Sequence, residues 1–109
     1  MADEKALALI QEDQLEAFNK YVESNGGAVD LSNAHLRAYD LRKYRLRKAN
    51  LTGTYMRATD LRSVDLSEAT LDGASIKEAK VSGVLFPRNL SPQEIMLSLV
   101  YGTRLRTGM

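Results

Sequence analysis

The sequence predicts a solenoid, in which the chain winds around one axis and bends every five residues, closed by an α-helix at each end. Three observations predict it. An apolar residue recurs at every fifth position through the middle of the chain, helix signals flank that region, and large aromatic residues are scarce. With 109 residues, no Trp and two Phe, one domain with a Leu- and Ala-rich core is expected.

The period of five is the main signal. Twelve apolar residues in succession lie five apart, at Leu31, Leu36, Leu41, Leu46, Leu51, Met56, Leu61, Leu66, Leu71, Ile76, Val81 and Phe86. A second column, mostly small and uncharged, lies two residues earlier, at Val29, Ala34, Tyr39, Tyr44, Ala49, Thr54, Thr59, Val64, Ala69, Ala74, Ala79 and Val84. A fixed period of this kind is stronger evidence for the fold than the helix or strand propensities of the individual residues.

Neither regular element accounts for a period of five. On an α-helix five residues advance by about 500°, so the apolar stripe rotates away from a core. On a strand an odd step reverses the side chain each time. The pattern therefore requires a chain that bends within each repeat and returns every apolar residue to one axis.

Residues 49–53 (ANLTG), 59–63 (TDLRS), 64–68 (VDLSE) and 69–73 (ATLDG) resemble the repeats of the pentapeptide-repeat family, whose consensus is A-(D/N)-L-x-x. The resemblance covers residues 29–88, and residues 18–32 are similar to the helix-then-repeat start of bacterial members. It implies a mainly β fold, a right-handed four-sided β-helix of about three coils, with four repeats in each coil. At a spacing of about 4.8 Å, three coils stack to roughly 14 Å.

Four residues depart from the small inner column. Tyr39 and Tyr44 are too large for a crowded inner site and fall in the first coil, so we expect them to lean towards the N-terminal helix or to distort that coil. Thr54 and Thr59 are milder exceptions.

The N-terminal end reads as one capping helix over residues 3–24. Its approximate apolar stripe is followed by Asn25-Gly26-Gly27, a strong stop signal. A helix of about 20 residues is roughly 30 Å long, so its Leu7 to Ile10 end is expected to overhang the coil and to meet a partner.

At the other end, a helix is predicted over residues 91–101, with Ser91 as N-cap, Pro92 in the first turn and Glu94 completing a capping box. Six of the seven residues at 95–101 are apolar, which favours a homodimer through this helix. The resemblance implies dimerisation at the same end. The candidate interface is Ile95, Met96, Leu97, Leu99, Val100 and Tyr101. The alternative is a helix folded over Phe86, with the tail 102–109 on top.

Charge is unevenly distributed along the chain. Residues 1–29 carry two Lys against six acidic residues, whereas residues 30–62 carry eight Lys and Arg against three Asp, which indicates a polarised surface. Residues 20 apart stack if a coil holds four repeats, which gives two basic columns as candidate partner-binding residues: Arg37, Arg57 and Lys77, and Arg42 with Arg62. A solvated face with local ion pairs is the simpler interpretation.

Catalysis is not predicted, and no cofactor or metal is expected. The chain has no Cys and a single His, His35, at an outward position, which is too few for a metal site. Asp or Asn before the central Leu is part of the repeat, where it can bond the turn backbone. Phosphate-binding and nucleophile motifs are not found.

The sequence thus favours a non-catalytic module for protein–protein interaction or scaffolding, with another protein as partner. A binder of an acidic partner or nucleic acid through the Arg columns is the alternative. A DNA-mimic modulator of gyrase, which the resemblance also suggests, is less favoured because the middle of this chain is basic. Without a readable signal peptide or membrane span, we expect a cytoplasmic protein.

Overall fold

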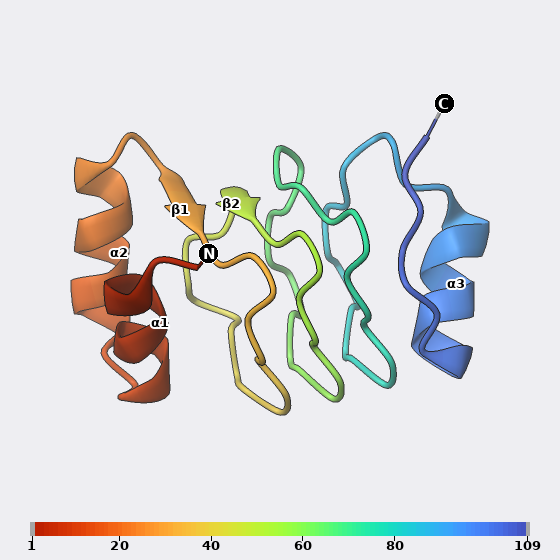
Figure 1. Cartoon of the computed structure of the whole chain (residues 1–109), viewed down its shortest axis with the longest axis horizontal. Helices are drawn as coiled ribbons and strands as arrows, with labels where there is room; N and C mark the ends of the chain where they lie inside the picture. Colours follow the sequence, from red (N-terminus) through yellow and green to blue (C-terminus); the bar gives the residue numbers. More distant parts are fainter. Residues whose placement is uncertain (1, 109) are drawn as a thin grey trace.

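The computed structural model describes residues 2–108 as a stack of turns with helices at both ends of its long axis (Figure 1). The elements in chain order are α1 (Glu4–Gln11), α2 (Leu15–Ser24), β1 (Ala28–Asp30), β2 (Lys48–Asn50) and α3 (Pro92–Tyr101). Helices α1 and α2 cover one end of the stack and α3 lies at the other. The long axis measures 35 Å and the two transverse axes 26 Å.

The turns of the stack are joined by parallel backbone pairing at a constant offset. Strands β1 and β2 are parallel, with Val29 opposite Ala49. Isolated bridges continue the same offset of twenty residues at His35–Tyr55, Asp40–Asp60, Asn50–Thr70, Tyr55–Ser75, Asp60–Lys80 and Asp65–Leu85. Twenty residues are four repeats of five, so each repeat lies beside the repeat four places later.

The column of central residues forms the core. Ten of its twelve members, from Leu31 to Ile76, are at most 1% exposed. Val81 and Phe86, which lie in the last turn, are only half-buried. Burying a Leu side chain contributes about 1.5–3 kcal/mol, so this column is the main source of stability.

A repeated bend returns each central residue to the axis. In most repeats the carbonyl of the central residue accepts from the N–H three positions later, as in Leu31 to Ala34 at 3.1 Å. The residue two after the centre often has a left-handed backbone, with φ of 66° at Gly53 and 74° at Gly73. The Asp or Asn before the centre braces the bend, as expected, because its side chain accepts from the N–H two residues on, as from Ser67 to Asp65 at 2.9 Å.

The prediction of one helix over residues 3–24 is wrong, because the chain breaks between α1 and α2. Asp13 has a left-handed φ of 58°, and the N–H of Gln14 closes α1 on the carbonyl of Leu9 at 2.8 Å. An unbroken helix of this length, roughly 30 Å, is longer than the 26 Å width of the molecule. The break brings Ile10 and Phe18 both into the core, so the expected overhang does not occur.

The oversized Tyr44 turns towards α2, as the sequence predicts. It is 7% exposed, and its ring packs edge-on against Phe18 at a centroid distance of 5.1 Å. The buried Thr hydroxyls both find carbonyl acceptors, Thr54 on Leu51 at 2.8 Å and Thr59 on Leu36 at 2.6 Å. Three of the four exceptions to the small inner column therefore have their own packing or hydrogen-bonding solution. The fourth, Tyr39, is half-buried against the core.

The C-terminal tail is part of the cap. Leu105 is 1% exposed, donates its N–H to the carbonyl of Ala74 at 2.7 Å and accepts from Gly73 at 2.8 Å. From α3, the buried Ser98 hydroxyl accepts from the N–H of Ile76 at 3.0 Å. The tail runs between α3 and the last turn in Figure 1.

The start of α3 differs from the expected capping box in one respect. Ser91 caps the helix by accepting from the N–H of Glu94 at 3.2 Å. The Glu94 carboxylate, however, binds the N–H and guanidinium of Arg106, the latter at 2.7 Å, instead of returning to Ser91. The helix start thereby anchors the tail.

A core truncation tests the central column. We expect Leu61→Ala to lower the free energy of unfolding by about 2–5 kcal/mol, because it removes fully buried methyl groups and leaves a cavity. Urea unfolding measures the change. Thr70→Ala is the matched control, since Thr70 is exposed on the outside of the stack, and it should change stability by less than about 0.5 kcal/mol. Equal losses in the two variants would contradict the inward column.

Candidate interaction surfaces

The second basic column is an ion-pair ladder. Arg42 binds Asp40 through Nε and Nη2, at 2.9 and 2.7 Å, and Arg62 binds Asp60 in the same way, at 3.0 and 2.8 Å. Arg42 Nε also lies 3.4 Å from Asp60, one turn further along the stack. This column is therefore a solvated face with local ion pairs, the simpler of the two interpretations of the sequence.

The first basic column is less uniform. Arg57 donates to Glu78 at 3.1 Å, a partner that the sequence analysis did not identify. The Lys77 side chain packs along Gly102 at the end of α3, close to where a Cβ would lie. Arg37 is exposed and forms no ion pair within residues 2–108. The three residues thus have three different environments and do not form one continuous basic surface.

Helix α3 has two apolar faces. Ile95 and Leu99 pack partly buried against the core, beside the fully buried Ser98. On the opposite face the exposed fractions are 58% for Met96, 37% for Leu97, 52% for Val100 and 71% for Tyr101. A hollow of about 520 Å³ runs along this outward face, lined by these four residues with Pro92 and Gln93. The predicted interface residues are therefore divided between core and surface.

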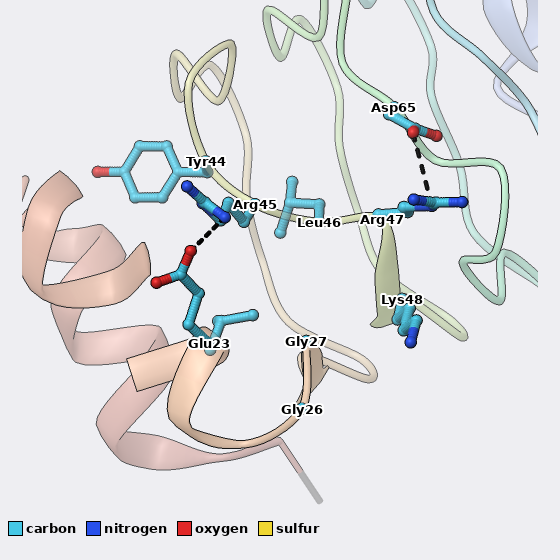
Figure 2. A pocket seen from close by; sticks show the side chains of 10 residues that line it. Glu23, Gly26, Gly27, Tyr44, Arg45, Leu46, Arg47, Lys48 and Asp65 are labelled. Carbon is cyan, nitrogen blue, oxygen red and sulfur yellow. Dashed lines mark ion pairs between the residues drawn. The ribbon is translucent and has the colours of Figure 1, made fainter. Parts of the chain in front are cut away.

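A groove at the other end of the molecule was not predicted. It measures about 510 Å³ and lies between the end of α2 and the chain entering β2 (Figure 2). Its lining is Val22, Glu23, Gly26, Gly27, Tyr44, Arg45, Leu46, Arg47, Lys48 and Asp65. Arg45 pairs with Glu23 across one side, and Arg47 pairs with Glu68 at 2.8 Å and lies 3.7 Å from Asp65.

Asn19 of α2 fixes one wall of this groove. Its side-chain amide donates to the carbonyl of Lys43 at 3.1 Å and accepts from the N–H of Arg45 at 2.9 Å. One side chain thus satisfies two backbone groups that a neighbouring strand would otherwise pair. In the sequence, this contact is indicated only by an Asn that follows Phe18. That signal is too weak to predict the two hydrogen bonds.

The described residues offer little for metal or membrane chemistry. Among residues 2–108 no group of three or more His, Cys, Asp or Glu side chains is placed to hold a metal ion. His35 is exposed and lies beside Tyr55, with ring centroids 6.0 Å apart. Over the same residues, every helix is too short or too polar to cross a membrane.

Comparison with known families supports the repeat interpretation. A family model for pentapeptide repeats matches residues 29–67 and 49–86, with eight copies. The chain belongs to the pentapeptide-repeat family. Members of this family are generally non-enzymatic interaction modules. Neither a search of curated proteins nor a search of solved structures gave a match.

The ion-pair ladder of this pentapeptide-repeat protein should make its free energy of unfolding depend on pH in the acidic range. The Arg42 guanidinium, with the Arg42 N–H, lowers the pKa of Asp40 from 3.8 to about 2. A depressed pKa in the folded state contributes stability that is present above about pH 4 and is lost as the pH falls towards 2. The difference in unfolding free energy between wild type and Asp40→Asn should therefore shrink between pH 5 and pH 2. A constant difference across that range would contradict the pairing.

Substitution of Asn19 tests the α2 contact of the pentapeptide-repeat stack. Asn19→Ala removes both backbone bonds and should destabilise the fold by about 1–3 kcal/mol, at about 0.5–1.5 kcal/mol for each bond. Asn19→Asp keeps the acceptor for Arg45 but loses the donor to Lys43, and should lie between wild type and Asn19→Ala. Urea unfolding measures both. If the two variants match wild type, the amide bonds do not hold this segment.

Proposed function

We propose that this protein is a non-catalytic interaction module that binds through the outward face of α3, and that its partner there is a second copy of the chain. The observation that carries the proposal is the exposure of Met96, Leu97, Val100 and Tyr101 on one helix face, while the opposite face is used by the core. A contiguous exposed apolar patch is typical of an interaction site.

The spacing of these residues suits self-association. Positions 93, 96, 97, 100 and 101 follow the i, i+3, i+4, i+7 pattern of a packing stripe. The hollow along this face has no charged residue in its lining, so two copies related by a two-fold axis can bring the same apolar patch together.

The last turn offers further surface at the same end. Cap hydrogen bonds reach residues 73–78, and within residues 2–108 no backbone bond is donated by the N–H of Val81, Gly83 or Phe86. Leu85, in the same segment, is 58% exposed. A ten-residue helix is only about 15 Å long, so a stable interface of 1,200–2,000 Å² requires this edge to contribute.

The finer architecture is also a proposal. We infer a right-handed, four-sided β-helix of about three coils, supported by the twenty-residue offset of every bridge and by the family's repeat. The basic columns are a weaker candidate for binding an acidic partner or nucleic acid, since Arg42, Arg57 and Arg62 already pair with carboxylates. Those Arg–carboxylate pairs also argue against a gyrase-directed DNA mimic, which requires a strongly acidic surface.

Light scattering after size exclusion tests the self-association. The wild type should run at twice the 12.1 kDa chain mass at high concentration, and Met96→Glu or Val100→Glu should return it to one chain mass, because a carboxylate would be buried in the apolar contact. Ala17→Glu, on the exposed surface of α2, is the matched control and should stay dimeric. A monomeric wild type at all concentrations would exclude the dimer.

A further inference from the structure

The outward face of α3 differs from one end of the helix to the other. Its N-terminal end carries the small ring of Pro92 and the amide of Gln93, and its C-terminal end carries the large ring of Tyr101. Met96 and Leu97, both exposed, lie between them. Gln93 and Tyr101 are eight residues apart, so about 12 Å separates them along the helix axis. A second copy that covers this face therefore has to fit a narrow end and a broad end.

The one charged side chain of α3 is turned away from this face. Glu94 is the only Asp, Glu, Lys or Arg in the helix, and its side chain is 13% exposed. Its carboxylate binds the guanidinium of Arg106 in the tail at 2.7 Å. Charge on the helix therefore does not keep two copies apart, and the shape of the face and the helix dipole determine how they meet.

A two-fold axis can relate the two α3 helices in a parallel or an antiparallel orientation. In a parallel pair, Tyr101 faces Tyr101 and Pro92 faces Pro92, so the helices are held apart at one end where the large rings meet. Such a gap removes packing contacts. In an antiparallel pair each Tyr101 ring meets the narrow end of the other helix. The dipoles favour this second orientation, because the N-terminus of each helix lies beside the C-terminus of the other.

We propose, on the basis of the self-association proposed above, that the two α3 helices pack antiparallel about a two-fold axis near Leu97. Tyr101 of each copy packs on Pro92 and Gln93 of the other, and Met96 and Leu97 form the centre of the contact. The Tyr101 hydroxyl stays at the rim, beside the Gln93 amide of the second copy. An aromatic ring that buries its body and keeps its polar tip at the edge is typical of protein interfaces. Tyr101 is thus the residue that sets the orientation of the dimer.

Disulfide cross-linking is the first test, and it is direct because the chain has no Cys. Gln93→Cys and Tyr101→Cys chains, one of them isotope-labelled, are mixed and oxidised, and mass spectrometry identifies the products. We expect the mixed disulfide to exceed either self-linked product at least tenfold. A disulfide spans Cα atoms up to roughly 7 Å apart, whereas the two copies of residue 93 in an antiparallel pair are separated by about 12 Å along the axis. Ala17→Cys, on the exposed surface of α2, is the control and should not cross-link.

A charge exchange is the second test. Tyr101→Glu should weaken the dimer at least tenfold, because it removes the ring and adds a carboxylate. Adding Gln93→Lys to the same chain places Lys opposite Glu at both ends of an antiparallel pair, and should recover at least threefold in affinity at low salt. Adding Gln93→Glu instead is the matched control and should recover nothing. Sedimentation equilibrium measures the dissociation constants, and thermal melts show that each variant is folded.

The outcomes separate the antiparallel arrangement from the proposed self-association. A dimeric wild type in which Gln93→Cys links to itself, or in which Gln93→Lys weakens the Tyr101→Glu dimer further, would overturn the antiparallel arrangement and leave the self-association standing. A wild type that stays monomeric at all concentrations would overturn both, and would assign this face of α3 to a different protein.

Discussion

The structure depends on the burial of one column of aliphatic side chains by a chain that bends within every five residues. The bend sets a central residue such as Leu51 or Leu61 on the axis and leaves the residues on either side at the surface. Because the column is filled from Leu31 to Ile76, the interior of the stack is occupied by side chains. Both hollows described above lie instead at the ends, beside α2 and along α3, where the repetition stops.

The unpaired backbone groups at the two ends of the stack are bonded by different parts of the chain. Any stack of turns presents unpaired backbone at its first and last turn, and those groups need partners. At the N-terminal end a side-chain amide, Asn19, supplies two of them. At the C-terminal end the tail lays Leu105 along the last turn and α3 contributes the Ser98 hydroxyl. The C-terminal solution is partial, and the surface that remains uncovered there is where we place the contact with a second copy of the chain.

The sequence predicts the repeat region well because its information is periodic. The central column, the braced bends and the inclination of Tyr44 towards the N-terminal helix all follow from residue size and spacing. Local signals also predict the C-terminal helix and its Ser91 cap, which the structure has at Pro92–Tyr101. The sequence predicts the tertiary contacts of the two ends poorly, because these contacts join residues far apart and occur once. The Asn19 amide binds backbone 24 and 26 residues away, and Arg106 reaches back 12 residues to Glu94. The break at Asp13 depends on the width of the stack, which no local pattern encodes.

The constant offset of twenty residues also determines what the surface charges do. It places Arg42 within reach of both Asp40 and Asp60, and Arg57 within reach of Glu78, so a basic segment of sequence becomes a set of internal ion pairs. Exposed pairs of this kind add little stability each, but a paired guanidinium is less available to a ligand. Partner binding is therefore more favourable on the outward face of α3, where the lining residues carry no charge that must first leave an ion pair.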